Sequence, residues 1–250
     1  MVLYLICPKC GYERKPHEKA PEESCPSCGL IFAKYKAGTS GRPESAIEAG
    51  FSDDSSLGAR AKALLLHVPD EVDQASIILR AVLFAGLVIY GVRLAAMDIP
   101  SWERASSLIH LPMVPIHEFG HVLFSPFGEF LMLLGGSLFQ VSLPLIFGGI
   151  FLAKNRDPFA ASVMLWWSAV AVMDVAPYMY DAAHPQHVLL TGRTGETGAH
   201  DFIDVLYDVG LLQQARAVGY AAHAFGVAML VIAFAWGGYV LYRQYLNRGL

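Results

Sequence analysis

Five consecutive residues, His117 to His121, carry the pattern H-E-x-x-H inside an apolar stretch of the chain. On a helix, His117 and His121 are four residues apart and share one face, so the two imidazoles can bind one zinc ion. Glu118 lies between them, where it can take a proton from a metal-bound water. The pattern predicts a hydrolytic zinc centre within a membrane, with a substrate that is itself in or at the membrane.

A catalytic zinc site needs a third protein ligand and an open position for water. An extended form of the motif has a third histidine further along, but that position is Phe127 here. Glu129 is close in sequence, although it lies beyond Pro126. A better source is the segment from Asp174 to Asp181, where two carboxylates enter an apolar span near its end and Pro177 weakens the helix between them.

Residues 106–181 resemble the site-2 protease family of intramembrane metalloproteases. In that family an H-E-x-x-H span is joined by a later span with N-x-x-P and then D-G. The resemblance implies that Asp181 is the third zinc ligand and that Asp174 and Pro177 lie at the substrate. This chain departs from the pattern: Asp174 replaces the Asn, Ala182 replaces the Gly, the interval is one residue shorter, and a PDZ domain is not evident.

The composition is that of a membrane protein. Of the 250 residues, 54% are hydrophobic and only 16% are charged, with a mean hydropathy of +0.42. Several stretches reach the roughly 20 apolar residues that a bilayer span requires. The formal net charge of −4 gives no indication of nucleic-acid binding. We therefore expect an integral membrane protein in contact with the lipid bilayer.

All four cysteines lie near the start of the chain, in two C-x2-C pairs separated by fourteen residues: Cys7, Cys10, Cys25 and Cys28. This spacing is typical of a zinc ribbon, and it predicts a structural zinc ion separate from the catalytic one. Two disulfides are the competing interpretation. Zinc-binding thiolates imply a reducing compartment, so the N-terminus is expected in the cytosol, with a cytosolic protein as the ribbon's partner. Similar ribbons precede many bacterial membrane proteins, which suggests the bacterial inner membrane.

The fold class expected is mainly α, a polytopic helical membrane protein with a small N-terminal β zinc ribbon. The chain divides into the ribbon (1–36), a linker with a short surface helix (37–75) and a transmembrane metalloprotease-like domain (76–250). Five spans are expected, at about 76–97, 106–125, 130–153, 158–181 and 217–242. The third contains Gly135-Gly136 and Pro144, and its first part is a candidate re-entrant turn lining the site.

A polar loop at about 182–214 contains further candidate metal ligands, among them His184 and His200. From His200-Asp201 onward, the segment HDFIDVLYDVGLL has apolar residues at near-helical spacing. It predicts a helix docked over the mouth of the site, with a substrate gate or an alternative metal ligand as the other interpretations.

With the N-terminus in the cytosol, the second and fourth of five spans both run inward. His117, His121 and Asp181 then lie toward the cytosol, and the site opens there. This arrangement places Lys154, Arg156, Arg243 and Arg248 outside, against the positive-inside rule.

The function expected is that of a zinc-dependent intramembrane endopeptidase acting on a transmembrane or membrane-anchored protein, with Glu118 as general base. A non-catalytic membrane adaptor with a structural or vestigial metal site is the alternative. A metal transporter is a third possibility, because ionisable residues in spans also mark ion paths.

Overall fold

A computed structural model of the chain describes residues 6–7, 12–14, 21, 23–27, 29–32, 57–69, 71–101, 103–188, 192–197 and 200–248. The chain forms two units, Met1–Asp54 and Ser55–Leu250. The second, helical unit contains the H-E-x-x-H motif.

In the first unit, Cys7 and Cys25 occupy equivalent positions in two short turns. The backbone N–H of Cys7 donates to the Tyr12 carbonyl and that of Cys25 to the Leu30 carbonyl, both at 2.9 Å. Both cysteine side chains are buried. The other two cysteines of the predicted zinc ribbon, Cys10 and Cys28, lie outside the described residues.

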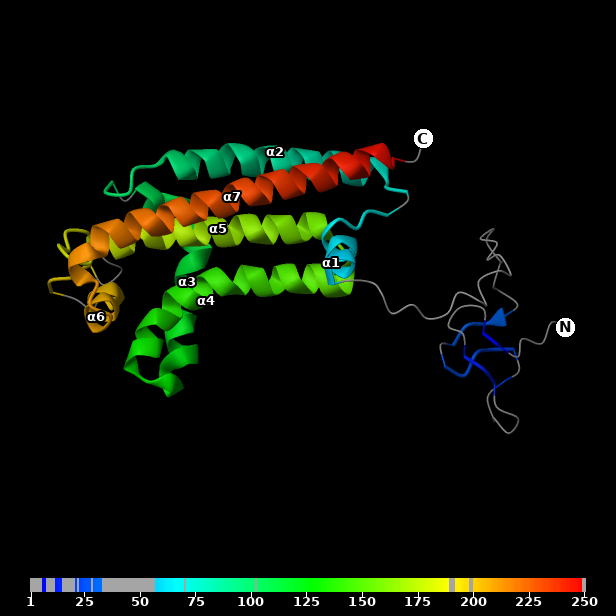
Figure 1. The fold of residues 1–250 in the computed structure, drawn as a ribbon, viewed down its shortest axis with the longest axis horizontal. Coiled ribbons are helices and arrows are strands. Elements are labelled where there is room, and N and C mark those ends of the chain that lie inside the picture. The colour runs from blue at the N-terminus through cyan, green and yellow to red at the C-terminus, as the bar shows by residue number, and fades with distance from the viewer. Residues whose placement is uncertain are drawn as a thin grey trace. The chain divides into compact units, whose positions relative to one another are not determined.

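The second unit is mainly helical in the residues that the structure describes (Figure 1). Its α-helices are α1 (Leu57–Leu65), α2 (Gln74–Ala96), α3 (His110–Phe124), α4 (Glu129–Ile150), α5 (Pro158–Asp181), α6 (Asp201–Asp208) and α7 (Ala215–Leu246). Shorter turns are η3 (Glu103–Ser106), η4 (Ser125–Phe127), η5 (Phe151–Asn155) and η6 (Leu212–Gln214).

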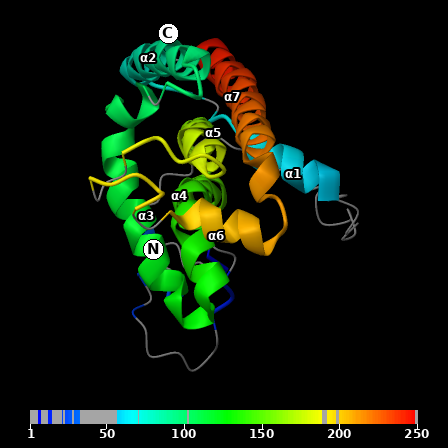
Figure 2. The same ribbon diagram turned by 90° about the vertical axis from the view of Figure 1, so that its left-hand side faces the viewer.

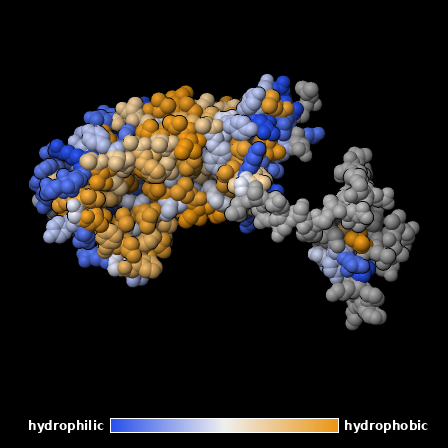
Figure 3. Space-filling model, viewed as in Figure 1, coloured by the Kyte–Doolittle hydropathy of each residue, from blue (hydrophilic) through white to orange (hydrophobic). Residues whose placement is uncertain are grey.

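Four helical segments of the described chain are long and apolar enough to cross a membrane: Gln74–Ala96, Glu129–Asn155, Pro158–Asp181 and Leu212–Leu246. Apolar side chains cover the middle of the helical unit and polar ones its two ends (Figure 3). The second expected span, at 106–125, corresponds to α3, which has only 15 residues. At 1.5 Å per residue α3 is roughly 22 Å long, less than the hydrocarbon core of about 30 Å.

Helix α5 is the centre of the unit, because α2, α4 and α7 all pack against it. Its contact with α7 is close at Gly226, where a Cβ atom would lie 2.5 Å from Cγ of Met173 and 2.9 Å from the Ala169 carbonyl oxygen. Met173 and Ala169 are fully buried. A small residue at Gly226 therefore lets the two helices approach, as expected for helices that pack in a membrane.

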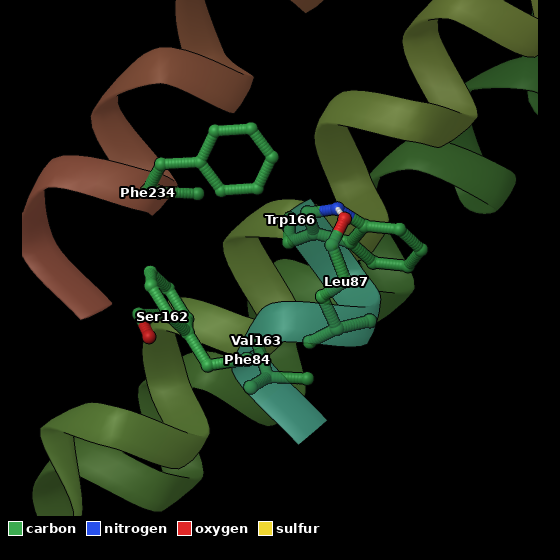
Figure 4. Close-up of a pocket in the computed structure, with 7 residues that line it drawn as sticks. Phe84, Leu87, Ser162, Val163, Trp166 and Phe234 are labelled. Carbon is green, nitrogen blue, oxygen red and sulfur yellow. Dashed lines mark hydrogen bonds between the residues drawn. The ribbon is translucent and has the colours of Figure 1, made fainter. Parts of the chain in front are cut away.

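Helix α2 joins this core through Trp166 of α5, whose indole N–H donates to the Leu87 carbonyl at 3.1 Å. A Cβ atom on Gly91 would lie 2.7 Å from that indole nitrogen, so glycine makes room for the ring. Beside the ring is a small pocket lined by Phe84, Leu87, Ser162, Val163, Trp166, Ala233 and Phe234 (Figure 4). The lining holds no ionisable side chain, so this pocket has a packing role.

One end of the helical unit, here called the terminal end, gathers the segment before α2, the start of α5 and the end of α7. The backbone N–H of Val72 donates to the Asn247 carbonyl at 3.1 Å. Arg80 of α2 donates to both carboxylate oxygens of Asp157, at 3.1 and 2.8 Å. These contacts fix the three segments to one another.

The opposite end, called the site end, contains the end of α2, the start of α3 and the start of α7. Arg104 is buried there. Its guanidinium donates to the carbonyls of Leu94 and Met97, at 3.1 and 2.6 Å, and Nη2 lies 3.2 Å from Nδ1 of His223 in α7. The arginine thus caps the last turn of α2, and His223 is its partly buried partner.

Helices α3 and α4 form a hairpin, closed by η4, at the site end. In Figure 2 the end of α5 is seen nearly along its axis while α3 is seen lengthwise, so α3 is steeply inclined to α5. The hairpin exposes large apolar side chains, including Phe119, Val122 and Phe127. Gly135 and Gly136, where a re-entrant turn was expected, lie inside the continuous helix α4.

The two ends correct the expected topology. The start of α2 meets Asn247 at the terminal end, whereas α5 ends at Asp181 at the site end. With four long helices in place of five spans, the candidate site lies at the end opposite to the start of α2. The expectation that both share one face came from counting α3 as a full crossing.

Candidate metal centre

Three side chains from two helices converge at the site end. Nε2 of His117 and Nε2 of His121, both on α3, each lie 3.3 Å from Oδ2 of Asp201 at the start of α6. One ligand atom from each lies within 4.8 Å of the others. Their side chains are 15%, 20% and 14% exposed, so the group is neither fully buried nor fully open.

The other ring nitrogen of each histidine is held by an oxygen atom. Nδ1 of His121 lies 2.8 Å from the carbonyl oxygen of Met132, and Nδ1 of His117 lies 3.0 Å from Oε1 of Gln140. Because these oxygens only accept hydrogen bonds, the single proton of each neutral imidazole is on Nδ1. Both Nε2 lone pairs then point toward Asp201, in the arrangement usual for metal-binding histidines.

Two bare imidazole nitrogens and a carboxylate oxygen are all acceptors and repel one another. Their approach to 3.3 Å requires a positive charge between them, either a metal ion or an additional proton on an imidazole. A His2Asp donor set with three protein ligands is typical of catalytic zinc. The residues present therefore fit zinc.

Helix α4 makes room for this group with two glycines. A Cβ atom on Gly136 would lie 2.5 Å from Nε2 of His121 and 2.7 Å from Nε2 of His117. A Cβ atom on Gly120 of α3 would clash with the backbone at Gly135. The glycine pair was expected to line the site. Gly136 does so as part of a helical surface on which the imidazoles rest, and not as a turn, whereas Gly135 packs against Phe124.

Asp201 is positioned by helix α6. Phe202, Val205 and Leu206 are buried and pack against apolar residues of α4 and α5. The backbone N–H of Asp201 donates to the hydroxyl oxygen of Tyr178 at 2.9 Å, which ties the first residue of α6 to α5. The apolar face of α6 thus fixes its polar first residue opposite α3.

Glu118, the predicted general base, follows His117 on α3 and is exposed. Of the residues predicted for the membrane site, His117 and His121 are thus brought together, with Glu118 adjacent.

Asp181, predicted as the third ligand, is not brought to the histidine pair. It ends α5, its side chain is 4% exposed, and its two oxygens accept from the backbone N–H groups of Gln186 and His187, at 3.0 and 3.4 Å. Its nearest imidazole nitrogens are Nε2 of His187 at 3.8 Å and of His200 at 4.0 Å. The structure places Asp201 at the pair, and Asp181 anchors the turn after α5.

The remaining candidates lie elsewhere. Asp174 accepts from Gln140 and lies beside His110, so it is linked to the pair through Gln140. Pro177 is buried inside α5. His200 stacks on Tyr178 with ring centroids 4.2 Å apart, and Glu129 is the exposed first residue of α4. The backbone N–H of His184 donates to the Asp181 carbonyl.

The sequence contained a signal for Asp201. The near-helical spacing of Phe202, Val205 and Leu206 predicted a docked helix over the site, and a metal ligand was one interpretation of the residues at its start. The resemblance to a known family favoured Asp181 instead. Sequence spacing alone does not predict whether Asp181 or Asp201 lies beside the two histidines of α3.

Comparison with models of known protein families gave no match, and comparison with curated proteins and with solved structures gave no significant match either.

Proposed function

We propose that this chain is a zinc-dependent endopeptidase that cleaves membrane-embedded or membrane-anchored proteins. His117, His121 and Asp201 hold the zinc ion, and Glu118 is the catalytic base. Asp201 takes the place that the family resemblance gives to Asp181.

The observation that carries the proposal is the convergence of three acceptors on one point. Both imidazoles are oriented through Nδ1, and Asp201 lies 3.3 Å from both Nε2 atoms. A structural zinc site is normally closed by four protein ligands, whereas this group has three among the residues that the structure describes. The open fourth position and the neighbouring Glu118 favour hydrolysis over a purely structural role.

The bound zinc ion would polarise the scissile carbonyl and lower the pKa of a water molecule. Glu118 takes a proton from that water as its oxygen adds to the carbonyl carbon. The same carboxyl group then gives the proton to the amide nitrogen as the C–N bond breaks, so that an acid and an amine are released. Apolar side chains of the α3–α4 hairpin, such as Phe119 and Val122, are suited to contact an apolar substrate segment.

The proposal also assigns a membrane face. Four basic residues lie at the terminal end. Lys154 is in η5 and Arg156 follows it, while Arg243 is in the last turn of α7 and Arg248 follows that helix. The positive-inside rule places this end in the cytosol, together with the start of α2. The metal centre then lies toward the opposite, extracytoplasmic face.

Because the substrate is not known, the test compares membrane proteins in cells that express the wild type or Glu118→Gln at equal levels. New protein N-termini are identified by mass spectrometry. We expect wild-type cells to contain termini within or beside apolar segments that Glu118→Gln cells lack, since the amide cannot accept the proton from water.

Zinc content of the two purified proteins is the control, because Glu118→Gln keeps all three ligands and is expected to bind the same amount. Identical sets of N-termini with equal zinc content would contradict the protease and favour the non-catalytic adaptor.

A further inference from the structure

We propose that Gln140, Asp174 and His110 are positioning residues that hold His117 in the one tautomer able to bind a metal ion. The inference rests on the metal-binding part of the proposed function and not on proteolysis. It concerns three polar side chains from three different helices, which form a single hydrogen-bonded chain leading to His117.

The row of hydrogen bonds that leads to His117 can be followed atom by atom. Oε1 of Gln140 accepts from Nδ1 of His117 at 3.0 Å, and Nε2 of Gln140 donates to Oδ2 of Asp174 at 3.0 Å. Nδ1 of His110 lies 3.0 Å from each carboxylate oxygen of Asp174. His110 begins α3, Gln140 is in α4 and Asp174 is in α5.

Asp174 fixes the direction in which these hydrogen bonds are donated. A carboxylate only accepts hydrogen bonds, so the amide of Gln140 must present its NH2 group to Asp174 and its oxygen to His117. The oxygen in turn requires the proton of His117 on Nδ1. A reversed amide would donate to Nδ1 and shift the proton to Nε2, where it would block metal binding.

Burial makes this orientation costly to lose. Gln140 is 4% exposed and the Asp174 side chain 6% exposed. A buried carboxylate needs partners, and His110 and Gln140 supply donors from both sides. A reversed Gln140 would place its carbonyl oxygen against the Asp174 carboxylate, two acceptors facing each other without a proton.

The two histidines are therefore held in different ways. His121 donates to the backbone carbonyl of Met132, which cannot reverse its polarity. His117 depends on a side-chain amide that could be placed either way round, and Asp174 removes that choice. The residues that hold this amide should influence metal affinity although they touch no metal.

The test measures Co2+ affinity of the full-length chain in detergent, using Co2+ as a visible substitute for zinc. Binding to the double variant His117→Ala/His121→Ala is subtracted, so that cobalt bound by the cysteine-rich unit is not counted. The test variant is Gln140→Leu. The matched control is Gln244→Leu. Gln244 is a similarly buried glutamine in α7, and it lies at the terminal end of the helical unit, away from the candidate metal centre.

We expect Gln140→Leu to lower Co2+ affinity about 10- to 100-fold, as is usual for the loss of a partner of a metal-binding histidine. Gln244→Leu should leave the affinity unchanged. Asp174→Ala should also lower it, and Gln140→Leu/Asp174→Ala should lose no more than Gln140→Leu alone, because Asp174 acts on His117 through Gln140.

A second measurement separates positioning from a loss of packing. The 15N chemical shifts of His117, assigned by comparison with His117→Ala, report which ring nitrogen carries the proton in the metal-free protein. We expect Nδ1 of His117 to carry a proton in the wild type and in Gln244→Leu, whatever the state of Nε2, and to carry it in only part of the molecules in Gln140→Leu.

Equal affinities and equal tautomers for Gln140→Leu and Gln244→Leu would overturn the inference. A wild type that binds no cobalt beyond the His117→Ala/His121→Ala variant would instead overturn the metal centre, and the tautomer signal would still decide whether the hydrogen-bonded chain orients His117.

Discussion

The two ends of the helical unit both gather polar side chains, but in opposite arrangements. At the terminal end, the carboxylate of Asp157 receives two hydrogen bonds from Arg80 and one from the backbone N–H of Ala160, so donors and acceptors match. At the site end, the acceptors of His117, His121 and Asp201 face one another. Matched pairs hold helices together, whereas converging acceptors require a positive charge between them, either a metal ion or an additional proton on an imidazole. The comparison therefore favours a structural role for the polar residues of the terminal end and metal binding by those of the site end.

The largest effect that this comparison predicts concerns the membrane faces of the two ends. In a chain whose own cysteines are replaced by serine, a cysteine at exposed Asn155 reports the terminal end and one at exposed Asp208 the site end. We expect a membrane-impermeant thiol reagent to label Asp208→Cys in intact cells and Asn155→Cys only after permeabilisation, because Lys154, Arg156, Arg243 and Arg248 lie at the terminal end.

Labelling of both positions from one face would show that the ends do not lie on opposite sides. The reverse pattern would keep the four-helix arrangement but place the metal centre in the cytosol, as the count of five spans had predicted.

The next largest effect is expected for Gly136→Ala in α4, which adds one methyl group beside the two imidazoles and should abolish Co2+ binding. Gly136→Ala places a Cβ atom 2.5 Å from Nε2 of His121, so we expect no Co2+ binding beyond that of the His117→Ala/His121→Ala variant. Gly149→Ala, near the terminal end of the same helix, meets nothing within 4 Å and should bind cobalt as the wild type does. Full binding by Gly136→Ala would mean that the imidazoles do not rest on α4.

Carboxylate removal compares the two ends directly. Asp201→Ala should lower Co2+ affinity by more than about 100-fold, since loss of an outer-shell partner alone costs 10- to 100-fold. Asp157→Ala should leave cobalt binding intact and lower the thermal unfolding temperature, because Arg80 loses its partner. Asp204→Ala removes an exposed carboxylate from the same helix as Asp201 and is the control for charge alone.

Apolar periodicity and length predicted the helical class and the approximate positions of all the long helices. The same reasoning counted the segment around His117 as a full crossing, because composition alone does not show how a helix is inclined. The error of one crossing moved the predicted site to the wrong end relative to the start of α2. The helix ends where Pro126 and Gly128 predicted, but it begins at His110 and not at about residue 106, which makes it too short for a full crossing.

The two histidines and Glu118 followed from local spacing, which a helix converts directly into geometry. The proposed third ligand, Asp201, depends on how α6 docks, which the chain determines through contacts between Phe202 and residues far away in sequence. Gln140 gave no signal at all, because a single glutamine in an apolar span does not show which histidine its amide will face. The positions of Asp201 and Gln140 therefore depend on long-range packing, which a local sequence pattern does not reveal.

The smallest effect, and the most discriminating for the choice between two carboxylates, is expected for Asp181→Ala. Its oxygens accept from the backbone N–H groups of Gln186 and His187, and the side chain is 4% exposed. Removing it leaves buried donors without partners, which costs about 1–3 kcal/mol of stability. Cobalt affinity should stay at the wild-type value while the thermal unfolding temperature falls, and Asp181→Asn, which keeps one acceptor oxygen, should fall less. If Asp181→Ala instead loses cobalt with its stability intact, then Asp181 is the ligand that the family resemblance implied, and the turn after α5 must rearrange to bring it to His117 and His121.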